Sequence, residues 1–332
     1  MQSRELRLRR RPAGLPTASD FELVTVDLAA PAEGQVQVRN LFMSVDPYMR
    51  GRMREGPSYA AAWQVGEVMQ GGAVGRVVAS AHTGFSVGDL VESNNGWREA
   101  FLSDGRGLGR IANPTAPPSA YLGVLGMPGR TAYDGLLGAA AMQPGETVFI
   151  SGAAGAVGSI AGQIAKLKGC RVIGSAGSVD KIAWCESLGF DVAFDYHAGD
   201  LPGQLRRAAP DGLDVYFDNV GGDHLQAAIG HMRARGRIAL CGAIAQYNAT
   251  EAVPGPNNLT MAIGLGLTLR GFIVGMYPEL REPFLREMGQ WVSDGTVQYR
   301  ETIYEGIERA PEAFLGLFTG ANTGKMLVRL GS

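Results

Sequence analysis

Short hydrophobic runs broken by glycine fill the first third of the chain. Each run is rich in β-branched residues or alternates apolar with polar positions, and turn signals such as Glu33-Gly34 and Gly88-Asp89 separate them. The clearest runs are 23–27, 35–42, 72–79 and 89–93. They predict a compact antiparallel, barrel-like domain over residues 1–120. The opening run from Arg4 to Arg11, with leucines between its charges, predicts an exposed edge strand.

The hydrophobic pattern changes to helical spacing between residues 118 and 140. Within it, GMPGRT at 126–131 predicts a loop that leads into a helix at 132–137, with its Pro-Gly pair as a hinge. Strands and helices then alternate. The predicted strands are 147–150, 171–174, 192–194, 215–218 and 237–241, and the predicted helices are 157–168, 180–188, 201–209 and 223–232. This alternation predicts an α/β fold with a doubly wound parallel sheet.

The last part of the chain returns to mixed elements. A helix from 279 to 291, a strand near 298–302, a helix near 307–318 and a strand at 325–330 are predicted to rejoin the first domain. The predicted domains are therefore 1–120 together with 279–332, and 121–278. The 332 residues are 45% hydrophobic and 19% charged, which is typical of a globular protein with two substantial cores.

The stretch from Thr147 to Lys181 carries the strongest functional signal. The stretch begins with a β-rich run, which is followed by a turn containing Gly152, Gly155 and Gly158 and then by a helical pattern. A second β-rich run follows at the distance expected for a strand–helix–strand unit. Glycines let a backbone approach a pyrophosphate, whose charge the helix N-terminus offsets. The stretch therefore predicts dinucleotide binding, although Ala154 occupies the position where the motif usually has its middle glycine. The alternative is a tight turn that binds no ligand.

The end of the second predicted strand favours NADP(H) over NAD(H). An NAD binder places an acidic residue there on the ribose hydroxyls, but this chain has Gly174-Ser-Ala-Gly-Ser178. Ser178 and Lys181 offer a hydroxyl and a cation for the additional phosphate of NADP. The alternative is that Lys181 is a solvated helix residue.

Two further regions hold candidate chemistry. Tyr247 follows the fifth predicted strand, where a loop tyrosine is either a proton donor or a packing residue. The segment from Ser44 to Met53 is polar, aromatic and basic between two β-rich runs, and it forms either a surface loop or a wall of the active site.

The composition limits which kinds of partner and metal site are expected. A net charge of −2 gives no general attraction to nucleic acid or to an anionic membrane, and no apolar run reaches the length of a membrane span. Cys170, Cys185 and Cys241 show no CxxC spacing, and the four histidines are scattered. We therefore expect no metal site, no nucleic-acid or membrane partner, and a cytoplasmic protein.

At this point the motifs carry a family resemblance. The chain resembles zinc-independent medium-chain dehydrogenases/reductases, in the group of prostaglandin reductases, leukotriene hydroxydehydrogenases and curcumin reductases, which are NADPH-dependent alkenal/one oxidoreductases. The matching motifs are VDPYMRGRM from Val45, GMPGRTAY from Gly126, SGAAGAVGS from Ser151, AKLKGCRVIG from Ala165, LGFDVAFDY from Leu188, YFDNVGG from Tyr216, GRIALCGAIAQYN from Gly236 and NTGK from Asn322. The resemblance implies a Rossmann domain plus a GroES-like β-barrel domain.

The resemblance also implies the site residues. Those of the cofactor are Gly155, Ala156, Val157, Gly158, Lys181, Tyr196, Asn219, Cys241, Gly242, Ala243, Ile244, Tyr247, Phe272, Ile273, Val274 and Asn322, to which charge adds Ser178. Relatives pass a hydride to the β carbon of an enone or enal. Donors at the oxygen, here Tyr247 and a cofactor ribose hydroxyl, stabilise the enolate without a metal. Tyr48 and the stretch from Met127 to Thr131 would frame the pocket.

One departure from the family pattern concerns substrate choice. Arg130 replaces the apolar residue usual in the MPGxTAY motif, so with Arg50 and Arg52 it would either favour an anionic substrate or point to solvent. The run from Leu267 to Val274 corresponds to the strand through which relatives pair two subunits, which implies a homodimer. Two other functions stay open: quinone reduction by the same fold, and a catalytically weak NADPH-binding or sensor protein.

Overall fold

The computed structural model describes residues 1–56 and 58–331, and the chain divides into two compact units. Unit 1 contains Met1–Leu122, Glu301–Asn322 and the C-terminal segment from Met326, and unit 2 contains Gly123–Arg300 and Thr323–Lys325. Residues 279–300 thus belong to unit 2, whereas the predicted boundary placed everything from 279 in the first domain. The reason is local: Phe284 packs edge-on against Tyr133, and Glu287 pairs with Lys168.

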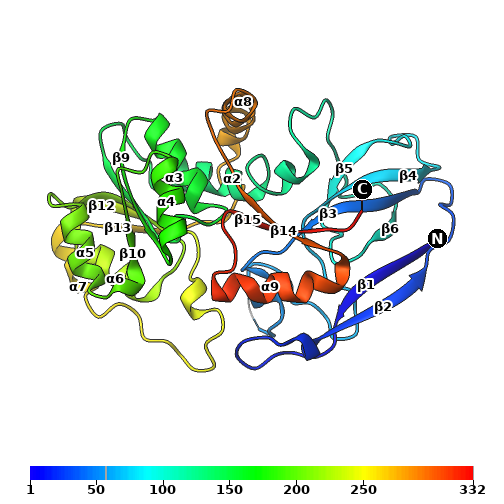
Figure 1. Cartoon of the computed structure of the whole chain (residues 1–332), viewed down its shortest axis with the longest axis horizontal. Helices are drawn as coiled ribbons and strands as arrows, with labels where there is room; N and C mark the ends of the chain where they lie inside the picture. The colour runs from blue at the N-terminus through cyan, green and yellow to red at the C-terminus, as the bar shows by residue number, and fades with distance from the viewer. Residues whose placement is uncertain (57, 332) are drawn as a thin grey trace. The chain divides into compact units, whose positions relative to one another are not determined.

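Unit 2 is built around a six-stranded parallel sheet (Figure 1). Its strands are β8 (Thr147–Ile150), β9 (Arg171–Ala176), β10 (Val192–Asp195), β11 (Leu213–Asp218), β12 (Met232–Leu240) and β13 (Thr268–Gly271). They are ordered β10-β9-β8-β11-β12-β13, and each neighbouring pair is parallel. This is the Rossmann order. The predicted doubly wound α/β fold is confirmed.

Helices connect these strands. They are α2 (Met127–Tyr133), α3 (Gly158–Leu167), α4 (Val179–Ser187), α5 (Leu201–Ala208), α6 (Gly222–Ile229), α7 (Thr260–Leu265) and α8 (Arg281–Ser293). Residues 126–131 were predicted as a loop with a hinge, and this was wrong. Pro128 lies in the first turn of α2, where its missing amide costs no hydrogen bond. Residues Asp134–Ala139 continue α2 as a π-helical segment.

Unit 1 is mainly antiparallel. Its strands are β1 (Gln2–Leu8), β2 (Phe21–Asp27), β3 (Val36–Ser44), β4 (Ala73–Ser80), β5 (Leu90–Ser93), β6 (Ala100–Ser103), β7 (Gly109–Arg110), β14 (Glu301–Glu305) and β15 (Lys325–Arg329). A sheet ordered β14-β15-β3-β4-β5-β7, with β6 on β3, forms the barrel-like layer, and β1 pairs with β2 separately. Two helices complete the unit, α1 (Met49–Arg52) and α9 (Ala310–Thr319).

The first strand is not the exposed edge that its arginines suggested. Leu6 and Leu8 are buried, and they pack in one cluster with Phe21, Trp97 and Phe314. Six of the seven residues of β1 are buried or half-buried, on both faces of the strand, with its two arginines half-buried, and Leu6 and Leu8 help to close the core of unit 1.

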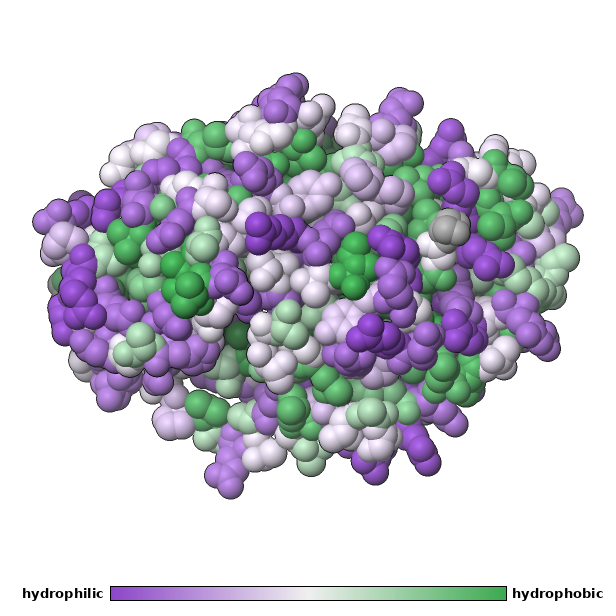
Figure 2. Space-filling model, viewed as in Figure 1, coloured by the Kyte–Doolittle hydropathy of each residue, from purple (hydrophilic) through white to green (hydrophobic). Residues whose placement is uncertain are grey.

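The surface view agrees with the composition. Hydrophilic residues cover most of the face in Figure 2, with hydrophobic residues scattered between them. No helix within residues 1–56 and 58–331 is long and apolar enough to cross a membrane.

Candidate functional site

The glycine turn of unit 2 is closed by direct backbone packing. A Cβ atom at Gly158 would collide with the carbonyl oxygen of Gly152 and lie 2.9 Å from Ala153 Cα. Gly152 has a positive φ of 60°, and its carbonyl accepts a hydrogen bond from the Gly155 amide at 3.0 Å. Because α3 begins at Gly158, the turn delivers its backbone directly to a helix N-terminus. This arrangement fits a pyrophosphate.

A buried polar network joins the ends of β8 and β11. The Tyr216 hydroxyl lies 2.7 Å from Asp218 Oδ1 and 2.9 Å from Ser151 Oγ. A phenol has one proton, so a consistent arrangement has Tyr216 donate to the carboxylate while the Ser151 hydroxyl donates to the Tyr216 oxygen. Ser151 Oγ also accepts the Asn219 amide at 3.0 Å, and its carbonyl accepts the Asn219 side chain at 2.8 Å.

Asp218 fixes two loops at once. Its Oδ1 accepts the amides of Val220 and Gly221 at 3.0 and 2.8 Å. Its carbonyl oxygen accepts the amides of Cys241 and Gly242 at 2.9 and 3.0 Å. Burial raises the pKa of Asp218, and the hydrogen bonds from the Gly221 amide, the Tyr216 hydroxyl and the Val220 amide oppose that rise. The network was missed in the sequence, although a serine and an aspartate at the ends of neighbouring strands were a visible signal.

Tyr247 lies in the loop that Asp218 anchors. Its hydroxyl oxygen accepts the Ala243 amide at 3.3 Å, and burial raises its pKa. The phenol therefore stays protonated and keeps its own proton to donate. Cys241, in the same loop, is a half-buried free thiol whose pKa burial raises to about 12.

The predicted phosphate-binding residues lie beyond β9 and β10. Ser178 caps α4 by accepting the Lys181 amide at 3.4 Å, and burial lowers the pKa of the Lys181 ammonium. Tyr196 stands beside them: a Cβ atom at Gly177 would lie 3.0 Å from its hydroxyl. The structure thus brings Tyr196 next to the loop that leads to Ser178. A hydroxyl, an ammonium and a phenol form a donor set that fits a phosphate.

The α2 residues have different environments. Met127 is exposed, Thr131 is buried and donates to the Met127 carbonyl at 2.8 Å, and Arg130 is 9% exposed. Arg130 was expected either to receive an anionic substrate or to face solvent, but its guanidinium is enclosed by Asp134 and the Tyr277 carbonyl. Only the i, i+4 spacing of Arg130 and Asp134 indicated this pairing in the sequence.

The segment after β13 completes the predicted cofactor residues of unit 2. Phe272 is buried and packs edge-on against Phe217 at 6.0 Å, whereas Ile273 is exposed and Val274 is half-buried. The strand itself spans four residues, which is shorter than the run from Leu267 to Val274.

In unit 1, the segment from Ser44 to Met53 leaves the end of β3 and contains the four-residue helix α1, which has a buried side. Met49 and Met53 are fully buried and anchor α1, while Tyr48 and Arg52 stay half-buried. Burial, with a smaller contribution from Asp46, raises the pKa of Tyr48. Arg52 donates to the Ala61 carbonyl at 2.9 Å and to Gln70 Oε1 at 2.8 Å. Asn322, in the segment before β15, is half-buried.

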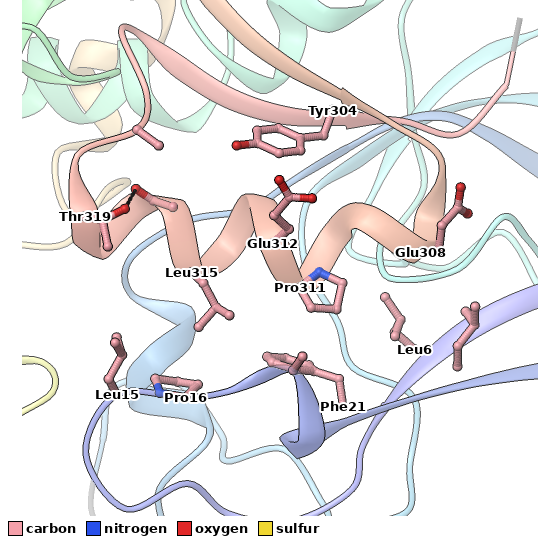
Figure 3. Close-up of a pocket in the computed structure, with 14 residues that line it drawn as sticks. Leu6, Leu15, Pro16, Phe21, Tyr304, Glu308, Pro311, Glu312, Leu315 and Thr319 are labelled. Atoms are coloured by element: carbon pink, nitrogen blue, oxygen red, sulfur yellow. Dashed lines mark hydrogen bonds between the residues drawn. The ribbon is translucent and has the colours of Figure 1, made fainter.

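A cavity of about 650 Å³ in unit 1 contains none of the predicted site residues. Figure 3 shows Leu15, Pro16 and Phe21 on one wall and α9 with Pro311 and Leu315 on the other. Its two carboxylates are already paired, Glu308 with Arg4 at 3.1 Å and Glu312 with Arg309 at 2.8 Å. Within residues 1–56 and 58–331, no group of three or more His, Cys, Asp or Glu side chains is arranged to hold a metal ion.

Comparisons with known proteins cover both units. Residues 4–111 match the family described as "N-terminal domain of oxidoreductase", and residues 156–290 match "Zinc-binding dehydrogenase". The chain is 45% identical to the NADPH-dependent curcumin reductase of Escherichia coli (strain K12), over 97% of this chain and 95% of the relative. It is 46% identical to prostaglandin reductase 1 of Bos taurus, over 97% of both. The crystal structure of CurA in complex with NADPH from Vibrio vulnificus matches with a TM-score of 0.94 and 42% identity over 99% of each chain.

Proposed function

The chain belongs to the medium-chain dehydrogenases/reductases, in the group of the curcumin and prostaglandin reductases, and we propose that it reduces the carbon–carbon double bond of α,β-unsaturated ketones and aldehydes with NADPH. The observation that carries this proposal is the similarity over 97% of the chain to a reductase that is itself NADPH-dependent. The site of unit 2 supports it with a closed glycine turn and a phosphate donor set.

The residues of unit 2 fit the cofactor at both ends. We infer that Gly155 to Gly158 hold the pyrophosphate, and that Ser178, Lys181 and Tyr196 hold the 2′-phosphate. Asn219, the loop from Cys241 to Tyr247 and the segment from Phe272 to Val274 would hold the rest. When bound, NADPH would supply the hydride for the β carbon of the substrate.

Tyr247 is proposed as the donor to the substrate oxygen. A donor placed where negative charge develops lowers the barrier most, and the retained proton of Tyr247 suits that role. Its raised pKa keeps it a neutral hydrogen-bond donor at physiological pH. Met127 and Thr131, which also belong to unit 2, would line the substrate pocket.

We propose that the reaction is zinc-independent. A conjugated acceptor spreads the developing charge onto its carbonyl oxygen, where hydrogen-bond donors suffice. The first 122 residues contain no cysteine, so the soft ligand typical of zinc in dehydrogenases is missing from this part of the sequence.

A homodimer and a cytoplasmic location complete the proposal. β13 is the last strand of its sheet, and Ile263 of the preceding α7 is 83% exposed, which favours burial against a second copy. Three free cysteines suit a reducing compartment. Sedimentation at micromolar concentration would test the dimer, and a stable monomer would contradict it. The expected partner is a small-molecule enone or enal, with no nucleic acid or membrane.

The deciding experiment is a substrate panel. NADPH oxidation is followed with enals, enones, quinones and secondary alcohols, each with and without a chelator. We expect enones and enals to react equally with and without chelator, and Tyr247→Phe to lower kcat by about a hundredfold. Activity with quinones alone would replace the proposal by quinone reduction. NADPH binding without any turnover would favour a sensor, and loss of activity with chelator would contradict the metal-free reaction.

A further inference from the structure

One face of the α2 helix and its π-helical extension receives the segment that follows β13. A Cβ atom at Gly135 would lie 2.5 Å from the Phe272 ring, and one at Gly138 would lie 2.6 Å from the Tyr277 ring. Neither glycine has a positive φ, so backbone conformation does not require them. They are small because the rings at both ends of residues 272–277 rest directly on the helix.

A buried ion pair on α2 and its π-helical extension also binds the segment from Phe272 to Tyr277. Arg130 Nε donates to Asp134 Oδ1 at 2.5 Å, one turn along the helix, and Asp134 is fully buried. The second carboxylate oxygen of Asp134 accepts the Gly275 amide at 2.9 Å. The Arg130 guanidinium donates to the Tyr277 carbonyl at 2.6 Å and lies over the Phe284 ring at 5.8 Å.

Each member of the pair therefore has one bond to its partner and one to the segment. The donors that Arg130 would need for a substrate carboxylate are engaged inside unit 2, and its side chain is 11% exposed. Asp134 supplies the compensating charge, without which a buried guanidinium would be costly. The geometry thus favours a holding role over anion recognition.

We propose that Arg130 and Asp134 are positioning residues that hold the segment from Phe272 to Tyr277 on helix α2. Resting on the proposed function, this pair sets the spacing between the cofactor-binding residues Phe272 to Val274 and the substrate-pocket residues Met127 and Thr131. Hydride transfer depends steeply on such spacing. Arg130 acts through the segment and does not select the charge of the substrate.

A double-mutant cycle tests the pair. The variants are Arg130→Met, Asp134→Asn and the two combined, with Arg281→Met, an exposed arginine of α8, as the matched control. Asn at 134 keeps an acceptor for the Gly275 amide, and the combined variant leaves no buried charge. Four quantities are measured: the NADPH Kd, kcat and KM with a neutral and a carboxylate-bearing enone, the isotope effect with NADPH deuterated at the transferred position, and amide exchange in peptides covering 272–277.

The expected pattern is specific to positioning. Arg130→Met leaves Asp134 as an unpaired buried charge, so it should raise the NADPH Kd about tenfold, lower kcat for both enones alike and speed exchange at 272–277. The combined variant should recover most of each loss, so that the effects of the single changes do not multiply. The control should match the unmodified protein.

Three outcomes would overturn the proposal. A loss in Arg130→Met confined to the carboxylate-bearing enone would assign anion recognition. Multiplying effects in the combined variant, or unchanged exchange at 272–277, would show that the two residues do not act as a pair. If the unmodified protein reduces no enone, the proposed function fails, but NADPH affinity and amide exchange still decide the positioning role.

Discussion

The cores of the two units are closed by different interactions. In unit 1, aromatic rings interlock: Trp97 packs against Phe21, Trp63 and Phe314 with centroids 6.0 Å apart in each pair. In unit 2, the sheet encloses polar groups, among them the hydroxyls and the carboxylate of Ser151, Tyr216 and Asp218. The core of unit 1 is stabilised mainly by apolar burial, whereas the core of unit 2 is also stabilised by directional hydrogen bonds.

The difference has a functional consequence. Apolar packing stabilises a fold without fixing any one atom, because dispersion and hydrophobic burial are spread over many contacts. Hydrogen bonds stabilise less but fix where a loop leaves its strand. Unit 2 places its polar groups at the carboxyl ends of β8 and β11, where a Rossmann sheet binds its ligand. Changes in unit 1 should therefore affect stability, and changes in unit 2 should affect affinity and pH response.

The largest effect should come from the aromatic core. Phe314 is fully buried against Phe21, Trp97 and Phe318, so Phe314→Ala should lower the free energy of unfolding by about 3–5 kcal/mol. Urea unfolding, followed by fluorescence and circular dichroism, measures it, with exposed Leu23→Ala as the control. The folded variant should bind NADPH normally. A weakened NADPH affinity of the folded variant at low urea would contradict the claim that changes in unit 1 affect stability alone.

A buried histidine should give unit 2 an acid-sensitive stability. Burial lowers the pKa of His224 to about 4, against an opposing effect of Asp223. Between its ordinary value of about 6.5 and pH 4, the unfolded chain gains a proton that the folded chain refuses, so stability falls with falling pH by up to about 3 kcal/mol. His224→Phe keeps a ring beside Tyr196 and should flatten this part of the pH profile. Equal slopes in both proteins would contradict the assignment.

The polar network should show a smaller, mixed effect. Tyr216→Phe removes one hydroxyl and leaves Ser151 and Asp218 with fewer partners, so the free energy of unfolding should fall by about 1–2 kcal/mol. Because the Asn219 and Cys241 loops depend on this network, the NADPH Kd should rise several-fold. Tyr121→Phe, which removes a hydroxyl bonded to the Thr115 amide in unit 1, is the control. A loss of stability with unchanged NADPH affinity would reduce the network to packing.

The sequence predicted the fold of unit 2 well because its signals are local. Alternating strand and helix patterns and the glycine turn each span fewer than about 20 residues, and the right-handed crossover rule then assembles them. The errors arose where tertiary contacts decide. β1 was expected to be exposed because its arginines dominate the pattern, yet Leu6 and Leu8 meet Phe314, over 300 residues away.

The site residues likewise divide into those that local sequence signals predict and those whose environment depends on tertiary contacts. Ser178 and Lys181 could be proposed from a missing acid and a cation within one short loop. The environment of Arg130 could not be derived, because two of its partners, Tyr277 and Phe284, lie about 150 residues further along the chain. Asp134 was within reach at i, i+4, but an ion pair on a helix is ordinarily a surface feature, and nothing local showed that this one is buried.

The smallest effect should be the most selective. Lys181→Ala removes a charge-assisted bond to the 2′-phosphate and should raise the NADPH Kd about tenfold, while the NADH Kd changes little. Lys166→Ala on α3, which breaks a half-buried pair with Asp191, is the matched control and should alter neither. Fluorescence titration with both cofactors measures the ratio. Because Lys181 is only half-buried, its loss should change the free energy of unfolding little, and an equal weakening of NADH binding would refute the phosphate role.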